Sequence, residues 1–283
     1  MSLKVDNSTS RTNKINKSWE KVQLSRHPQR PYSEDYIDFI FKSFEEFKGD
    51  RLFKEDPAIL CGIGTLQGDK NKKVFFIGHQ KGRKTKDKIK HNFGMASPEG
   101  YRKAMRVFEL ANRFDIPVLC FIDTPGAYPG IEAEERGQAE AIASCISQML
   151  QLKVPSVAVV IGEGGSGGAL ALASADSLLM LEHATYSVIS PESCAAILWS
   201  DASKSHEAAH ALKLSAQDVF KLKLCDEVIP EVKDGAHEKP EETAKNLLNA
   251  IHKHLHFHSK KSAARREKNR FLKFRKIDSH VQK

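Results

Sequence analysis

The stretch PSVAVVIGEGGSGGALALASA, residues 155–175, decides the fold of this chain. Its first seven residues are apolar and rich in valine, which is typical of a strand buried on both faces. Glycines follow from Gly162 to Gly168, and the small residues from Gly167 to Ala175 predict a helix. Glycine lets a backbone approach a ligand closely, and a helix N-terminus adds partial positive charge. The stretch therefore predicts a strand, an anion-binding loop and a helix.

A second glycine-containing segment has the same setting. Asp123–Gly130 (DTPGAYPG) follows the apolar run Ile116–Asp123 and precedes a predicted helix at Glu132–Lys153. Loops of this kind offer backbone N–H groups to a phosphate, a carboxylate or a developing oxyanion.

The rest of the chain alternates between apolar runs and helical patterns, which predicts an α/β layered fold. A helical period covers Tyr36–Phe47, and two β-branched runs, Ala58–Gln67 and Lys73–Gly82, predict a hairpin across the polar turn 68–71. Lys81–His91 is expected to be a basic loop, and Ser97-Pro98 to begin a helix. Further strands are expected at 177–181, 186–190 and 226–230, and further helices at 191–200, 205–214, 215–223 and 239–258.

Length and composition limit the class of protein. The chain has 283 residues, of which 40% are hydrophobic, enough for one large or two small globular domains. It contains no apolar run of 18 residues, and its polar, basic start does not resemble a secretory signal. The five cysteines form no C-x-x-C pair, which disfavours both a zinc site and a disulfide scaffold. We expect a reduced, cytoplasmic, metal-free chain.

The net charge of +8 is concentrated at the C-terminus. From Lys253 onward there are eleven lysines and arginines against two acids, so the other 252 residues carry a net charge of about −1. This tail has two interpretations: a solvated, partly helical terminus, or a surface that binds nucleic acid. The first is favoured, and deletion of residues 259–283 is then expected to leave the activity near normal.

The glycines of 162–168 fit several known motifs. Gly162, Gly164 and Gly167 match G-x-G-x-x-G, with Glu182 at the spacing of a dinucleotide-binding site. However, no clear run of strand–helix–strand units follows. The pattern alone also allows an anion or oxyanion cradle, or simply close packing of a helix on a strand.

A nucleophile elbow is a further alternative. Gly164, Ser166 and Gly168 match G-x-S-x-G, and Asp201 and His206 follow in the order of a hydrolase triad. They follow only a few residues apart, so no histidine is convincingly placed as the base. Ser166 is therefore not expected to be a nucleophile.

Two other chemistries find little support. No lysine follows the glycines, which excludes a phosphate-binding P-loop. The histidines at 252, 254, 256 and 258 lie on a predicted helix, where a spacing of two scatters them around the axis. They are interpreted as an incidental polar end.

An ordered set of motifs resembles one family. The motifs are RHPQRPY (26–32), GHQKG (78–82), NFGM (92–95), PEGYRKA (98–104), FIDTPGAYPG (121–130), EERGQ (134–138), IGEGGSGGAL (161–170), YSVISPE (186–192) and ILW (197–199). Together they resemble the carboxyltransferase alpha subunit of bacterial-type acetyl-CoA carboxylase, over about residues 19–250. The resemblance implies a crotonase-like (ClpP/crotonase) spiral of ββα units. It also implies the domain limits: an N-terminal extension at 1–30, the carboxyltransferase domain at 31–258 and a basic tail at 259–283.

The resemblance also implies a function. Such subunits pair with a zinc-carrying beta subunit as α2β2 and work with biotin carboxylase and a biotin carboxyl carrier protein. They move a carboxyl group from carboxybiotin on the carrier to acetyl-CoA, giving malonyl-CoA for fatty-acid synthesis. No metal and no membrane association is expected for the alpha chain itself, and nucleic-acid binding by the tail is a minor possibility.

By the same resemblance, Gly167 and Gly168 supply oxyanion donors for biotin. Gly164 and Gly165 shape the loop. Gly126, Ala127 and Gly130 line the cleft. A side chain at Gly168 is expected to block the biotin ring while leaving the fold intact. The basic residues Lys81, Arg83 and Lys84 could contact CoA phosphates, although solvated loop charges are the favoured interpretation. The chain departs from the family in its short start, with about 18 residues before Trp19, and in its C-terminal tail.

Overall fold

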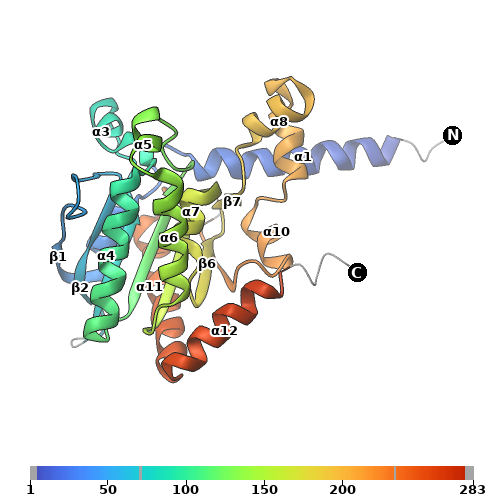
Figure 1. Cartoon of the computed structure of the whole chain (residues 1–283). Coiled ribbons are helices and arrows are strands. Elements are labelled where there is room, and N and C mark those ends of the chain that lie inside the picture. Colours follow the sequence, from blue (N-terminus) through green and yellow to red (C-terminus); the bar gives the residue numbers. More distant parts are fainter. Residues whose placement is uncertain (1–4, 70–71, 233, 278–283) are drawn as a thin grey trace.

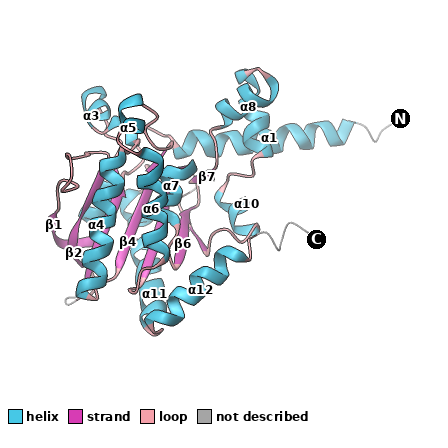
Figure 2. Cartoon of the chain, viewed as in Figure 1, coloured by secondary structure: helices cyan, strands magenta, loops and turns pink. Residues whose placement is uncertain are grey.

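The computed structural model describes residues 5–69, 72–232 and 234–277. These residues form an eight-stranded sheet, coloured magenta in Figure 2, with strands in the order β1-β2-β3-β4-β5-β6-β8 and β7 paired to β5 outside that path. The strands are β1 Phe41–Glu46, β2 Ile59–Leu66, β3 Lys73–His79, β4 Val118–Thr124, β5 Ser156–Gly165, β6 Ser177–Leu181, β7 Thr185–Ser187 and β8 Glu227–Ile229.

The sheet has an antiparallel edge and a parallel centre. β1 pairs with β2 and β2 with β3 in antiparallel register, and the pairs from β3 through β8 are parallel. Every residue of β4 and β6, and the first seven of β5, are buried. Continuous apolar runs suit strands covered on both faces, as the sequence predicted.

Helices cover both faces of the sheet, which gives three layers (Figure 1). One face carries α4 (Pro98–Phe114), α6 (Gln138–Leu150) and α7 (Ser166–Ala173). The other carries α2 (Ser33–Ile40) and α11 (Pro240–Ser259). β4 and β5 are parallel neighbours between these layers, so their carboxyl ends lie together at one edge of the sheet.

A smaller group of helices lies beside that edge. α1 (Val5–Ser25) packs on α9 (Ser205–Ala211), which packs on α8 (Pro191–Trp199), and α1 extends well beyond the body in Figure 1. Trp19 stacks on His206, and Val22 packs with Leu214 in a small separate core. The other helices are α3 Thr85–Lys90, α5 Ile131–Glu135, α10 Ala216–Lys221 and α12 Ala263–Arg275. No helix within the described ranges is long and apolar enough to cross a membrane.

The predicted helix Tyr36–Phe47 is wrong in its second half. α2 ends at Ile40, and the chain continues as β1, which pairs with β2 from Phe41 opposite Leu66. Short apolar runs fit either period, and here pairing with β2 satisfies the backbone. The Phe41 ring also packs on Phe76 at 5.2 Å between centroids.

Two further expectations need correction. The helix predicted at Glu132–Lys153 is broken into α5 and α6 at Gly137, whose φ of 81° is left-handed. The expected basic loop at 81–91 contains the short helix α3. The hairpin is confirmed as β2 and β3, although residues 70 and 71 of its turn lie outside the described residues.

The two termini are helical where they are described. α1 covers most of the predicted extension 1–30, of which residues 1–4 lie outside the described part. α12 covers residues 263–275 of the basic tail, and residues 278–283 again lie outside. α12 is not simply solvated, because its Arg266 and Arg270 are buried.

Candidate active site

The two glycine-containing segments lie against each other at the carboxyl ends of β4 and β5. A Cβ atom built on Gly165 would lie 2.1 Å from the carbonyl oxygen of Pro125, and one on Gly168 would lie 2.6 Å from the backbone nitrogen of Ala127. Contacts this short to backbone leave room only for hydrogen. The glycines therefore let two backbones touch, and the site is built at that contact.

The glycine-rich stretch is only partly a loop. Gly162–Gly165 continue β5, where Glu163 pairs with Thr185 and Gly165 with Ser187 of β7. α7 then begins at once at Ser166, which has a left-handed φ of 51°. The sequence missed this extension of the strand because glycines usually interrupt strands. Here they remain extended so that Asp123 and Tyr186 can pack directly on the backbone of Gly162 and Gly164.

The first turn of α7 carries free backbone donors. Because the helix begins at Ser166, the N–H groups of Gly167 and Gly168 precede its first i→i−4 hydrogen bond. Within the described part of the chain, no group outside α7 accepts a hydrogen bond from either of them. The helix dipole adds partial positive charge at the same place. Two adjacent donors at a helix N-terminus are suited to an anionic oxygen.

A cavity of about 330 Å³ opens beside these donors. Gly167 lines it, whereas Gly168 is buried behind it against Ala127. The other lining residues come from β7, α7 and the segment leading to β8: Ser166, Leu170, Tyr186, Ser187, Val188, Leu212, Lys213, Val219, Leu222 and Leu224. The cavity is mainly apolar, with the donors at one wall.

The predicted lining residues from the first segment take different positions. The backbone of Ala127 lies against Gly168, behind the cavity. Gly126 has a φ of 153°, and its N–H donates to the Thr124 hydroxyl at 3.1 Å. Gly130 instead precedes α5, and a Cβ there would lie 2.4 Å from the Tyr128 ring. No contact places Gly130 beside Gly167 or Gly168 among the described residues.

A network of ion pairs supports the glycine-rich end of β5. Lys81 lies between Asp123 at 2.7 Å and Glu163 at 2.8 Å. On its other side, Glu163 pairs with Arg26 at 2.6 Å, and Arg26 pairs with Glu192 at 2.5 Å. We call these five residues the β5 network. They come from the end of α1, the segment after β3, β4, β5 and α8, so the network ties five parts of the chain together.

The charges of the network are held in place by their mutual contacts. Burial opposes ionisation of Glu163, but Lys81 and Arg26 outweigh it and lower its pKa to about 2. Burial likewise opposes the charge of Lys81, yet Asp123 and Glu163 raise its pKa above the ordinary value. For Asp123 burial dominates, and its pKa is raised despite Lys81.

Sequence reasoning missed this network, although its residues belong to motifs that carry the family resemblance. It left Lys81 and Arg83 open as contacts for CoA phosphates and favoured solvated loop charges, but neither side chain is simply solvated. Lys81 is only 13% exposed and is fully engaged by two carboxylates. Arg83 pairs with Asp35 and lies over the Tyr32 ring. Lys84 remains exposed.

The two competing motif interpretations find no support. No described histidine or carboxylate is hydrogen-bonded to Ser166. His206 stacks on Trp19, and Asp201 accepts hydrogen bonds from Ser203. For the dinucleotide motif, the first two glycines lie inside β5, and Glu182 accepts the N–H of Glu231.

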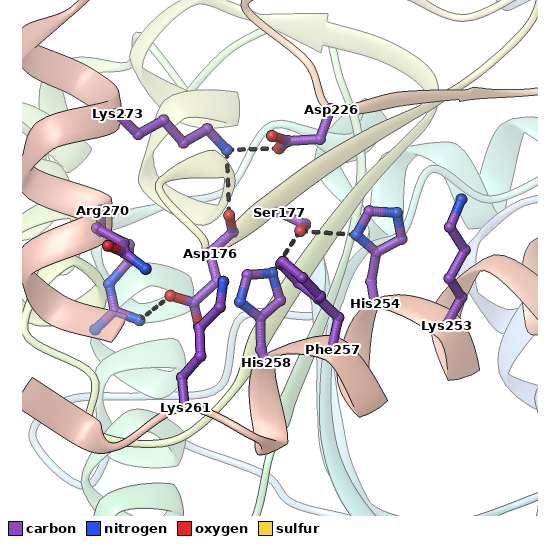
Figure 3. Close-up of a pocket in the computed structure, with 11 residues that line it drawn as sticks. Asp176, Ser177, Asp226, Lys253, His254, Phe257, His258, Lys261, Arg270 and Lys273 are labelled. Carbon is purple, nitrogen blue, oxygen red and sulfur yellow. Dashed lines mark hydrogen bonds and ion pairs between the residues drawn. The ribbon is translucent and has the colours of Figure 1, made fainter. Parts of the chain in front are cut away.

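The histidines of α11 have defined partners. His254 Nδ1 and His258 Nε2, one helical turn apart, each lie 2.8 Å from the Ser177 hydroxyl (Figure 3). His254 Nε2 also lies 2.7 Å from Glu227. They line a cavity of about 450 Å³ at the start of β6, the edge of the sheet opposite the glycines. The polar end is therefore a structural contact between α11 and the sheet. Among the described residues, no group of three or more histidines, cysteines or carboxylates could hold a metal ion.

Comparisons with known proteins indicate one family. A family described as acetyl co-enzyme A carboxylase carboxyltransferase-like matches residues 1–278. The chain is 56% identical to the acetyl-coenzyme A carboxylase carboxyl transferase subunit alpha of Methylococcus capsulatus over 84% of this chain and 73% of that protein. It is 51% identical to the subunit of the same name from a strain of Thermus thermophilus, over 93% of this chain and 84% of that protein.

Solved structures show the fold. The transcarboxylase 12S subunit superposes with a TM-score of 0.63 at 17% identity, over 80% of this chain and 42% of that one. The beta subunit of Pseudomonas aeruginosa geranyl-CoA carboxylase gives 0.61 at 17% identity, also over 80% and 42%. These likenesses confirm the predicted crotonase-like fold, and this chain spans less than half the length of either structure. Taken with the family match and the close relatives, they show that the chain belongs to the family of acetyl-CoA carboxylase carboxyltransferase alpha subunits, and so to the transferases.

Proposed function

We propose that this chain moves a carboxyl group from carboxybiotin, held on a separate carrier protein, to acetyl-CoA, giving malonyl-CoA. The observation that carries the proposal is the pair of adjacent free N–H groups in the first turn of α7, where Gly167 lies at the wall of the 330 Å³ cavity and Gly168 is buried directly behind it. Cavities that hold small ligands begin at about 300 Å³, so the space suits a small bicyclic ring. Carboxybiotin supplies the carboxyl group and, on losing it, places negative charge on its ureido oxygen.

The role of the chain in this reaction is to bind and stabilise. The two N–H groups donate to the oxygen on which charge develops, and they are fixed before the reaction begins because β5 and α7 hold them. The apolar wall, with Leu170, Val188 and Leu212, excludes water and strengthens these hydrogen bonds. We assign Gly164, Gly165, Gly126 and Ala127 to the support of this wall. No described side chain next to Gly167 acts as a general base, and none is needed here for the donors to work.

We further propose that the active enzyme is an α2β2 assembly with a beta subunit that carries zinc. Three large apolar side chains near the cavity are exposed. Val188, directly after β7, is 73% exposed, and Ile197 and Leu198 of α8 are 71% and 65% exposed. Exposed apolar patches of this kind are typical of subunit contacts. Biotin carboxylase and the biotin carboxyl carrier protein complete the proposed system. We assign residues 31–258 to the carboxyltransferase domain, 1–30 to an extension and 259–283 to the tail, and place the enzyme in the cytoplasm.

The test compares the purified chain, the beta subunit and the co-expressed complex in a malonyl-CoA-forming assay with the carboxylated carrier. Only the complex should be active. Gly167→Val keeps the backbone N–H group but adds a side chain beside it that hinders the approach of the ligand oxygen. It should lower the transfer rate by about 10²-fold or more, the scale set by losing one oxyanion interaction. The complex should keep its melting temperature, because a Cβ at Gly167 meets nothing closer than Ile142 at 3.6 Å.

Two results would contradict the proposal. Full activity of the chain without a beta subunit would show that the active site is not shared between two subunits. Full activity of an intact Gly167→Val complex would show that no ligand oxygen approaches the N–H group of Gly167, which removes the oxyanion role from α7. A control for lost stability is Gly137→Ala, which places a methyl group at a left-handed φ of 81° at the start of α6, away from the cavity, and should keep the transfer rate.

A further inference from the structure

Lys81 is placed between two buried carboxylates directly behind the proposed oxyanion donors. Its Nζ contacts Asp123 Oδ1 at 2.7 Å and Glu163 Oε2 at 2.8 Å. The side chains of Asp123 and Glu163 are 2% and 14% exposed, so water contributes little to holding their charges. The ammonium group of Lys81 therefore compensates both.

Asp123 and Glu163 are also joined through the backbone. Asp123 Oδ1 accepts the backbone N–H of Glu163 at 2.9 Å, and the same carboxylate packs on Gly162, where a Cβ would lie 2.4 Å away. The side chain of Asp123 thus fixes where β5 runs just before its last turn. Since α7 begins at Ser166, three residues after Glu163, a shift at Glu163 passes directly to Gly167 and Gly168.

Removal of Lys81 would leave two like charges in contact with each other. Buried carboxylates that share a site cannot both ionise without cost, so the pair would keep a proton or move apart. Arg26 would still neutralise Glu163 on one side. The other titratable groups that face this cluster from neighbouring elements include Arg30, Tyr32, Tyr36, His79, Lys88 and Glu192.

We propose that Lys81 is a positioning residue for carboxyl transfer: it holds Asp123 and Glu163 together so that β5 presents the N–H groups of Gly167 and Gly168 at a fixed place. The inference rests on the proposed function of these two glycines. Lys81 acts through the strand and touches no reacting atom. A displacement of about 1 Å in a catalytic geometry costs about 10²-fold in rate, which sets the size of the expected effect.

The experiment uses the co-expressed complex with Lys81→Met, Lys81→Arg and the double variant Lys81→Met/Glu163→Gln. For Lys81→Met, kcat should fall by about 10²-fold while KM for acetyl-CoA stays within about two-fold, because the donors act in the transition state. Its kcat should fall further from pH 6 to pH 9, since both carboxylates ionise in turn. The native complex should not show this added dependence.

The other variants separate charge from packing. Lys81→Arg restores a cation and should recover at least about ten-fold in kcat over Lys81→Met. The double variant removes the like-charge pair, so it should fold, and its pH profile should run parallel to that of the native complex while kcat remains low. Lys253→Met is the matched control, because Lys253 also pairs with a carboxylate at 2.7 Å but is 66% exposed and lies far from the glycines.

Lys81→Met with a native kcat, or with a pH profile parallel to the native one, would overturn the proposal. If Lys81→Met does not assemble, the double variant decides: a native kcat in it would equally overturn the role. The Gly167→Val complex, assayed beside these, keeps the two ideas apart. Loss of activity in Gly167→Val with native activity in the Lys81 variants would reject only the positioning role, whereas a fully active Gly167→Val would reject the glycine site itself.

Discussion

A Cβ atom on Gly168 would lie 2.6 Å from the backbone nitrogen of Ala127, so the start of α7 is packed against the segment after β4 with no space for a methyl group. The sequence had suggested that a side chain at Gly168 would block the ligand and spare the fold. The structure reverses that expectation, because the missing side chain would point into backbone. Gly168 is buried, whereas Gly167 faces the cavity.

Gly168→Ala should therefore lose stability, by about 1–3 kcal/mol for an overpacked contact. Gly167→Ala should stay within about 0.5 kcal/mol, because its new methyl group would lie 3.6 Å from Ile142 Cγ2. Urea unfolding of the two variants measures the difference. Equal stability of both would mean that the Gly126–Ala127 segment moves aside easily.

Ser166 should tolerate substitution, and glycine should suit its backbone better than serine. Its φ of 51° is left-handed, a conformation that costs an L-residue roughly 1 kcal/mol. Ser166→Gly is expected to raise the free energy of unfolding by about 0.5–1 kcal/mol and to keep the transfer rate. Ser166→Ala should also keep the rate. Covalent labelling of Ser166 by a serine-directed phosphonate would contradict this and support a nucleophile.

His258 should make the protein less stable in mild acid. Burial lowers its pKa from 6.5 to about 4. Between these values the unfolded chain binds a proton that the folded chain does not, so stability falls as the pH falls from 6.5 to 4. His258→Gln should reduce this loss by about 1–3 kcal/mol across the window.

The measurement is the free energy of unfolding in urea at several pH values, and the slope is compared rather than the absolute stability. His256→Gln is the matched control, since His256 is exposed on the same helix. Part of the slope should survive in His258→Gln, because burial lowers the pKa of His79 to about 3. An unchanged slope would show that His258 is protonated in the fold.

The C-terminal helix should contribute strongly to stability. Arg270 pairs with Asp176 at 2.8 Å, and both side chains are at most 2% exposed (Figure 3). Arg270 also donates to the carbonyl oxygens of Leu150 and Leu152. Arg270→Met leaves Asp176 buried without its partner and should cost about 3–5 kcal/mol.

Arg265→Met, on the exposed side of the same helix, should change stability by less than about 0.5 kcal/mol. Calorimetry of both variants tests the contrast. For the same reason, deletion of residues 259–283 should destabilise the protein, whereas the sequence alone led us to expect only that the activity would stay near normal. A deletion variant that melts like the native chain would show that α12 does not hold Asp176 in solution.

The sequence predicted the parallel centre of the sheet well, because β4, β5 and β6 are continuous apolar runs. This is the pattern expected of strands that are buried on both faces. It failed where tertiary contacts override local pattern. Phe41 begins a strand because β2 is there to pair with it, and Gly162–Gly165 stay extended because Asp123 and Tyr186 pack on them. Neither partner is visible in the local sequence.

The site was predicted in part. The family resemblance implied that the two glycine segments line one cleft, and the structure brings them into contact. The β5 network was not predicted, since Arg26, Lys81 and Glu192 are separated by up to 166 residues and pair only in the folded chain. The charged residues inside several motifs could have indicated this network. A buried carboxylate between glycines is stable only when it is paired with a cation.

β5 ends at Gly165 and α7 begins at Ser166, so no residue separates strand from helix. Many enzymes diversify by lengthening or shortening the loop that carries their donors. Here an inserted or deleted residue would rotate the helix by about 100° and turn both N–H groups away from the cavity. Insertions and deletions at this junction would therefore destroy the arrangement of the N–H donors. Changes of substrate in relatives must arise from the opposite wall, where β7 and the residues around Leu212 contribute side chains.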